Sequence, residues 1–335
     1  MKQKAPKKSA AESAISPGER IAKRMARAGL CSRRDAERWI EDGRVKVNGK
    51  LLKTPACVVT DRDKIEVDGE PLPSRERSRL WLYHKKSGLV TTSKDPEGRT
   101  TVFESLPDDL PRVLSVGRLD INTEGLLLLT NDGGLARALE LPSTGWLRRY
   151  RVRAHGTVTQ EQLDDLKDGI AVDGVLYGAI DAELERQQGS NVWLTFAMRE
   201  GKNREVKNVL GALGLNVNRL IRLSYGPFQL GDLEAGQVRE VRGRTLRDQL
   251  GAKLIEQSGA NFDAPLASPK ERKQAPAKNR TNKSAKRKAF DPLARLDTKK
   301  PEREGRSGRG KPAQERRGGG AGQGKKARGN ADRQR

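Results

Sequence analysis

The spacing of apolar and polar residues in the amino-terminal part of the chain predicts a small mixed unit. Ser32 is followed three residues later by Asp35, the spacing of a capping box, which indicates a helix start after a first short helix. The dipeptides at 48–49 (Asn-Gly) and 68–69 (Asp-Gly) are typical of tight turns between short strands. We therefore expect residues 18–73 to form two helices and a few strands.

A different pattern begins at Leu80, after the charged stretch SRERSR at 74–79. Apolar runs predict several strands, and two amphipathic stretches predict helices. The predicted strands are Trp81–Tyr83, Leu126–Thr130, Tyr150–Ala154 and Val192–Ala197, and the predicted helices span 160–168 and 203–213. Because strands outnumber helices and do not alternate regularly with them, an α+β fold with a mostly antiparallel mixed sheet is favoured over a doubly wound parallel one.

The two ends of the chain are poor in apolar residues. Residues 251–335 hold 24 Lys/Arg and 9 Asp/Glu, so this stretch carries +15 of the net charge of +23. Its few large apolar side chains cannot offset the entropy of ordering it. We expect a disordered basic arm at 1–17, a linker at 74–79, a second domain at 80–250 and a disordered Lys/Arg/Gly-rich tail at 251–335.

Composition excludes several protein classes. The longest apolar run, Leu126–Leu129, is far too short to span a membrane. Cys31 and Cys57 form neither a disulfide framework nor a zinc cluster, and His84 and His155 are too few for a histidine metal site. We expect a cytoplasmic chain with no bound metal and no membrane partner. The strongly basic balance indicates a polyanionic partner, and nucleic acid is the expected one.

Basic side chains gather on the two predicted amino-terminal helices and suit phosphate contacts. They are Arg20, Lys23, Arg24, Arg27, Arg33, Arg34 and Arg38. A solvated face is the alternative, because acidic residues are interspersed among them. The helix pair followed by VKVNGK resembles the RNA-binding domain of the ribosomal small-subunit protein four type, which supports the RNA interpretation.

The least ordinary stretch is VGRLDINTEGLLLLTNDG at 116–133. It places Asp120 on a polar loop directly before a fully apolar strand, where a carboxylate could be held in fixed geometry for catalysis. The alternative is a turn in which Asp120 caps backbone amides. A third interpretation pairs Asp120 with Glu124 or Asp132 as two glycosidase-like acids.

GRLDxxTEGLLLLTNDG resembles the active-site motif of the pseudouridine synthases of the RsuA/RluB type, which isomerise single uridines in ribosomal RNA. The stretches HKKSGLVTTSKDPEGRTTVFESL at 84–106, PSTGWLRRYRV at 142–152 and EGKNREVKNVLGALGLNVNRLIRLSYG at 200–226 are similar to further motifs of this family. The resemblance covers about residues 18–245, with both domains in the family's order. It implies an enzyme that needs no cofactor, because the reaction has no redox step and transfers no external group.

The resemblance also implies the roles of three residues. Asp120 is expected to be the essential carboxylate, acting as nucleophile or as base on the sugar. Lys207 matches the basic position that pairs with this aspartate, although 87 residues separate the two; without the family, a surface lysine would be favoured. Tyr150 matches the tyrosine that stacks on the extruded uracil; its alternative is a strand tyrosine packed in the core.

Two arginines are candidate RNA contacts. Arg118 precedes the aspartate loop and could hold a phosphate, or instead pair with Glu124. Arg204 could contact the RNA backbone at the start of its helix, or simply be exposed.

The 200–226 stretch is most similar to the large-subunit branch of the family, so large-subunit (23S) ribosomal RNA is the expected partner of a monomeric enzyme. A small-subunit (16S) target and a non-catalytic RNA-binding assembly protein are the alternatives. We expect the tail to raise RNA affinity through counterion release.

Overall fold

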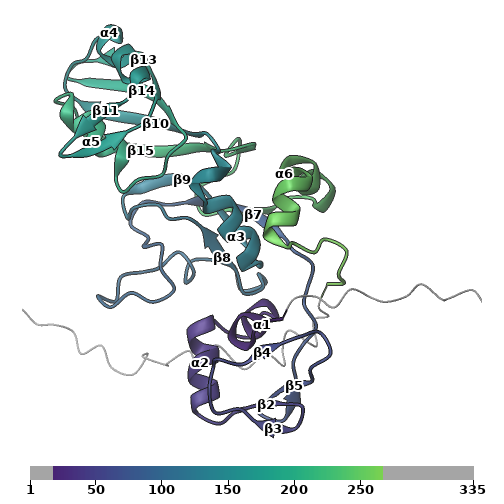
Figure 1. Cartoon of the computed structure of the whole chain (residues 1–335). Coiled ribbons are helices and arrows are strands. Elements are labelled where there is room, and N and C mark those ends of the chain that lie inside the picture. Colours follow the sequence, from purple (N-terminus) through teal and green to yellow (C-terminus); the bar gives the residue numbers. More distant parts are fainter. Residues whose placement is uncertain (1–17, 267–335) are drawn as a thin grey trace, which may run out of the picture. The chain divides into compact units, whose positions relative to one another are not determined.

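The computed structural model describes residues 18–266. Residues 18–73 form a small unit with two short helices and two small antiparallel sheets (Figure 1). Its elements are β1 (Glu19–Arg20), α1 (Ile21–Arg27), α2 (Arg33–Glu41), β2 (Val45–Val47), β3 (Lys50–Leu51), β4 (Val58–Val59), β5 (Ile65–Val67) and β6 (Glu70–Pro71). The sheets have the orders β1-β4 and β3-β2-β5-β6. The core of this unit is built from residues of α1, α2 and these strands, including Ile21, Met25 and Ile40.

The predicted turns and cap of this unit are confirmed. Ser32 and Asp35 form the capping box at the start of α2, with each side chain bonded to the other's backbone amide. Asn48 and Gly49 both have positive φ angles, 52° and 78°, as a tight hairpin between β2 and β3 requires.

The second domain is built on a nine-stranded sheet of order β13-β14-β10-β15-β9-β7-β17, with β16 on β15 and β8 on β9. Its strands are β7 (Leu80–Lys85), β8 (Leu114–Val116), β9 (Thr123–Thr130), β10 (Arg148–His155), β13 (Ile180–Gln188), β14 (Asn191–Met198), β15 (Asn216–Tyr225), β16 (Phe228–Gln229) and β17 (Val238–Glu240). A separate hairpin pairs β11 (Ile170–Val172) with β12 (Val175–Tyr177). Every strand pair of the large sheet is antiparallel except β9 with β15, so the predicted α+β fold with a mostly antiparallel mixed sheet is confirmed.

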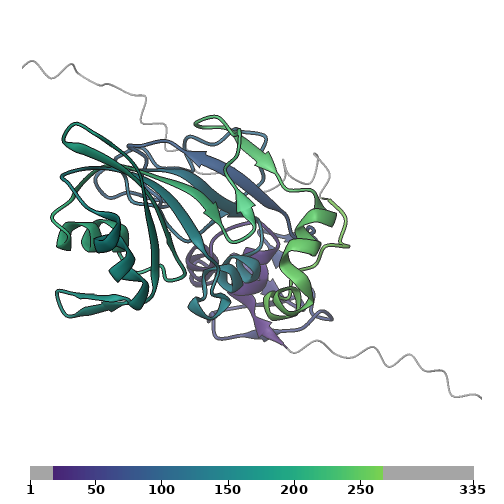
Figure 2. The same ribbon diagram turned by 90° about the horizontal axis from the view of Figure 1, so that it is seen from above.

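Helices cover different parts of this sheet. They are α3 (Gly133–Glu140), α4 (Gln160–Asp164), α5 (Glu205–Ala212) and α6 (Gly243–Ser258), with short 3₁₀ turns at Pro142–Thr144 and Asp165–Asp168. The helices α4 and α5 contact β13 and β15, whereas α3 contacts α6, β8 and β9. In both views α6 (green) lies far from the α4–α5 region (teal) along the sheet (Figures 1 and 2).

The central strand β9 is buried on both faces, which explains its continuous apolar run. Leu126 and Leu128 pack into the cluster that α3 and α6 close, and Leu127 and Leu129 pack into the opposite cluster around Trp81. This double burial holds β9 rigidly, and with it the loop that precedes it.

The predicted tail boundary is wrong at its start. α6 begins before residue 251 and continues to Ser258, with a kink at Gly251. Leu254, Ile255 and Phe262 pack against the cluster of β9 and α3, so these apolar side chains extend the domain beyond residue 250. The rest of the predicted tail, like the predicted arm at 1–17, lies outside the described residues.

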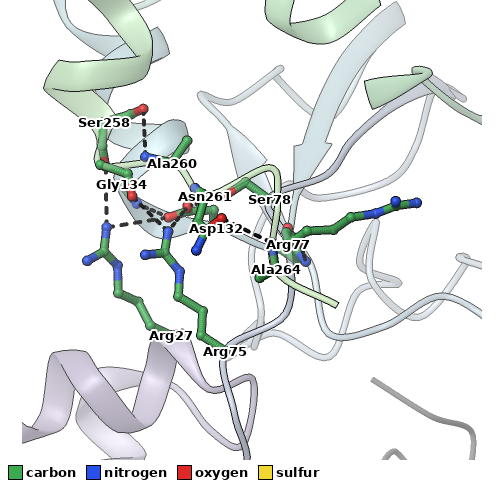
Figure 3. A network of polar contacts seen from close by, with 12 residues as sticks. Arg27, Arg75, Arg77, Ser78, Asp132, Gly134, Ser258, Ala260, Asn261 and Ala264 are labelled. Carbon is green, nitrogen blue, oxygen red and sulfur yellow. Dashed lines mark hydrogen bonds and ion pairs between the residues drawn. The ribbon is translucent and has the colours of Figure 1, made fainter. Parts of the chain in front are cut away.

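The linker is held by a network of polar contacts around Asp132, which caps the start of α3 (Figure 3). The Asp132 side chain is 3 % exposed and accepts hydrogen bonds from Ser78 Oγ at 2.6 Å, Arg75 at 2.5 Å and the Gly134 amide at 2.8 Å. An Arg27 guanidinium nitrogen from α1 lies 3.9 Å from the same carboxylate. Asp132 is therefore a structural anchor.

No helix in the described part of the chain is long and apolar enough to cross a membrane.

Candidate active site

Asp120 lies on the six-residue loop between β8 and β9. The loop is fixed on both sides of the aspartate. Leu119 is buried and its carbonyl accepts a hydrogen bond from Thr91 Oγ1 at 2.8 Å, and the Thr123 amide donates to the Asp120 carbonyl at 3.0 Å. The Asp120 side chain itself is 40 % exposed, so it is held in place yet open to a substrate.

A buried lysine binds the backbone of this loop through hydrogen bonds. Lys85, at the end of β7, is fully buried, and its ammonium donates three hydrogen bonds of 2.9 to 3.0 Å to the carbonyls of Lys86, Ile121 and Thr123. All three of its protons are thereby used. Burial lowers the pKa of Lys85 to about 8, while the negative charges of Asp120 and Glu124 oppose that shift. The sequence did not single out Lys85, although Trp81, Tyr83 and Lys85 share one face of an alternating strand.

Lys207 reaches the aspartate from a distant segment. It lies on α5, whose apolar stripe of Val206, Val209 and Leu210 is buried against the sheet. The Lys207 Nζ is 4.0 Å from Asp120 Oδ2, and the Lys207 side chain is 21 % exposed. The structure thus brings together the two residues that only the resemblance had joined.

Tyr150 lies on β10, which β15 separates from β9, the strand that follows the Asp120 loop. Arg222 of β15 is paired both with Tyr150 and with Gly125 of β9, so the Tyr150 and Gly125 backbones are two strand spacings apart, roughly 10 Å. The Tyr150 side chain belongs to the core cluster that α5 covers, and the residue is 9 % exposed. The core interpretation therefore describes this residue, and no hydrogen bond joins Tyr150 to Asp120 among the described residues.

Arg222 is buried at the point where the pairing of β15 with β9 ends, opposite Gly125. Its Nε donates to the Leu126 carbonyl at 2.7 Å, and its guanidinium lies 5.1 Å from the Tyr225 ring centre. The backbone of β15 approaches β9 so closely that a Cβ on Gly125 would be 2.3 Å from the Arg222 carbonyl oxygen. Gly125 has φ +100°, so both its conformation and its missing side chain are required here.

The second acids of the glycosidase-like pair are engaged elsewhere. Glu124 is bound by Arg219 through two hydrogen bonds of 2.8 and 3.0 Å, which also replaces the suggested Arg118–Glu124 pair. Asp132 lies past the other end of the eight-residue strand β9, roughly 25 Å from the aspartate loop. Both acids are held by other partners, which argues against the glycosidase-like pair.

The other arginine candidates are accessible. Arg118 is exposed on the loop that carries Asp120. Arg204 is exposed at the start of α5, where its backbone takes a left-handed conformation with φ 51°.

The basic residues of the amino-terminal unit divide into two groups. Lys23, Arg24 and Arg27 share Glu19 as an ion-pair partner, and Arg38 pairs with Asp35. The remaining three are exposed and have no acidic partner within 4 Å among the described residues: Arg20, Arg33 and Arg34.

Comparison with known proteins identifies the family. Residues 79–212 match the RNA pseudouridylate synthase family and residues 19–65 match the S4 domain. The chain is 46 % identical over 228 residues to an uncharacterised RNA pseudouridine synthase of Rickettsia felis, covering 68 % of this chain and 99 % of the relative. The chain belongs to the RNA pseudouridine synthase family. It is also 40 % identical over 269 residues to ribosomal large subunit pseudouridine synthase B of Pseudomonas aeruginosa, covering 77 % of this chain and 69 % of the relative.

This pseudouridine synthase is of the RsuA/RluB type, an S4 domain joined to a synthase domain, as the motifs predicted. In the described part of the chain, no three His, Cys, Asp or Glu side chains gather in a way that could hold a metal ion. The acid–base groups that the geometry does bring together are Asp120, Lys207 and Lys85.

Proposed function

We propose that this enzyme converts one uridine of large-subunit (23S) ribosomal RNA to pseudouridine, with Asp120 as the essential carboxylate. The observation that carries this proposal is the Asp120–Lys207 approach of 4.0 Å at a rigid, solvent-accessible loop. The reaction is an isomerisation. The bond from ribose C1′ to uracil N1 breaks, a bond from C1′ to C5 forms, the C5 proton leaves, and N1 gains a proton.

The site supports this chemistry through charge. Asp120 must be ionised to act as nucleophile or base on the sugar. A carboxylate enclosed by a bound nucleotide would lose water and tend to protonate, and a nearby cation opposes this. Lys207 supplies that cation on the open side, and the buried Lys85 supplies a second one beneath the loop. The structure therefore contains the electrostatic support that the proposed carboxylate needs.

Base recognition is assigned to Tyr150. A uridine must leave its helix or loop before a protein group can reach its sugar, and an aromatic face recovers part of the lost stacking. Tyr150 is on β10, which β15 separates from β9, and the residue is 9 % exposed. We propose that the uracil packs against the exposed part of the Tyr150 ring, with Arg118 and Arg204 on the flanking phosphates.

The choice of RNA rests on the relatives and on charge. Two of the relatives with an assigned target act, by name, on the ribosomal large subunit, and they come from Pseudomonas aeruginosa and Xanthomonas campestris. The basic S4 residues and the net charge of +23 fit a large polyanionic substrate. We propose that the S4 domain binds structured RNA through its exposed arginines, including Arg33 and Arg34.

The test is to map pseudouridines across ribosomal RNA in cells with and without this chain. The proposal predicts one missing site in large-subunit RNA, restored by the wild-type gene. A missing site in small-subunit RNA would contradict the large-subunit target. Loss of no site at all would favour an RNA-binding assembly protein that lacks catalysis.

A further inference from the structure

A cavity of about 420 Å³ opens between the end of the linker and the start of α6. Four of its lining residues are arginines, Arg77, Arg79, Arg244 and Arg247, and we refer to it as the arginine groove. The side of the groove that the linker forms is bound to the carboxyl-terminal segment of the domain. The Ser78 amide donates to the Asn261 carbonyl at 2.6 Å, and the Asn261 amide donates to Ser78 Oγ at 3.0 Å. The groove is therefore preformed.

The charges of the groove do not cancel. Two of its arginines are paired with the two acids that line it: Arg79 donates to Glu240 at 2.7 Å, and Arg247 pairs with Asp263. Arg77 and Arg244 have no acidic partner within 4 Å among the described residues, which leaves two uncompensated positive charges. The Arg77 side chain points away from the Asp132 network (Figure 3).

A further observation indicates an anion. The helix α6 begins at Gly243 without a side-chain cap, because Arg242 occupies the capping position, and Gly243 and Arg244 line the groove. Free amide groups of a first helical turn beside arginine side chains form a ready site for a phosphate.

We infer that the arginine groove binds phosphodiester groups of the substrate RNA at a distance from the modified uridine. This inference rests on the proposed function for the identity of the RNA. The groove lies where β7 begins, and Leu80 of β7 pairs with Thr130 at the far end of β9 from the Asp120 loop. The eight residues of β9 separate the two by roughly 25 Å, so the groove contacts RNA several nucleotides away from the target.

A phosphate contact far from the reacting uridine stabilises the enzyme–RNA complex and the transition state equally. Its loss raises KM and leaves kcat unchanged. It also reduces the number of counterions released on binding. Each phosphate contact adds about 0.7 to 0.9 to the slope of log K against log salt, so losing two contacts lowers the slope by roughly 1.4 to 1.8.

The experiment compares full-length chains carrying Arg77→Gln with Arg244→Gln, or Arg137→Gln with Lys253→Gln. The second pair removes the same charge from exposed positions of α3 and α6 outside the groove. Binding to a ribosomal RNA fragment is measured at several salt concentrations, and single-turnover and steady-state pseudouridine formation are measured on the same RNA. Melting temperatures confirm that both variants fold.

We expect the groove pair alone to lower the salt slope by the stated amount and to raise KM at constant kcat. Arg77→Lys with Arg244→Lys should retain the wild-type slope. Equal slopes for the groove and control pairs would overturn the inference. The inference would also be overturned if inorganic phosphate raised the melting temperature of the wild-type chain while the groove pair left the salt slope of RNA binding unchanged. The groove would then bind a free anion and not the RNA. Absence of pseudouridine with the wild-type chain would instead contradict the proposed function, while the slopes would still report on the groove.

Discussion

Replacing Gly125 with alanine tests whether the close approach of β9 and β15 holds the active-site loop. The new Cβ would lie 2.3 Å from the Arg222 carbonyl oxygen and 2.6 Å from its amide nitrogen, and both are backbone atoms. The strands would have to separate by roughly 1 Å, at an overpacking cost of about 1 to 3 kcal/mol. Alanine at φ +100° adds about 1 to 3 kcal/mol of backbone strain. The expected loss of stability is about 2 to 6 kcal/mol.

For a domain of this size, that loss lowers the melting temperature by roughly 5 to 20 °C. Circular dichroism melts of the full chain measure it, with Gly211→Ala as the matched control. Gly211 lies in α5 with open space around its Cα, so alanine there should stabilise the helix by up to about 1 kcal/mol. A Gly125→Ala chain that melts with the wild type would refute the account of this strand pair.

Three other substitutions or conditions probe the site and the tail. Lys207→Met should lower kcat by at least about a hundredfold with RNA binding intact, because a cation beside the reacting carboxylate is lost; single-turnover rates decide, and Lys207→Arg should recover part of the activity. Lys85 has a pKa of about 8 in the folded chain and 10.5 in the unfolded chain, so its contribution to the free energy of unfolding increases as pH rises between those values. The reaction rate should instead fall above about pH 8, because the positive charge of Lys85 is lost. A rate that stays flat to about pH 9.5 would exclude a role for this charge. A chain ending at Leu266 should bind ribosomal RNA more weakly and with a shallower salt slope while single-turnover isomerisation persists, and unchanged binding at low and high salt would contradict a role for the tail.

Local sequence signals predicted much of the fold. The capping box at Ser32, the Asn48-Gly49 turn and the buried run of β9 depend on neighbouring residues, and each is present as expected. The second half of α6 was missed because residues 251–258 were grouped with a basic, apolar-poor tail. Its stability comes from long-range packing of Leu254 and Ile255 on β9 and α3, which composition cannot show.

The site was predictable only in part. The motif placed Asp120 on a loop before a buried strand, but spacing could not bring Lys207 to it across 87 residues; the resemblance did. Lys85 carried a usable signal, since it occupies an inward position of an alternating strand. The arginine groove carried none, because residues 77–79 and 240–247 are brought together by the long-range pairing of β7 with β17, which local sequence does not show.

The most direct test of the central claim is tritium release from RNA labelled at uridine C5, because the C5 hydrogen leaves when carbon replaces nitrogen at C1′. Purified wild-type chain should release tritium from one site of large-subunit ribosomal RNA. The Asp120→Asn chain should bind the same RNA with similar affinity and release none. Release at the wild-type rate by Asp120→Asn would show that Asp120 is not the essential carboxylate.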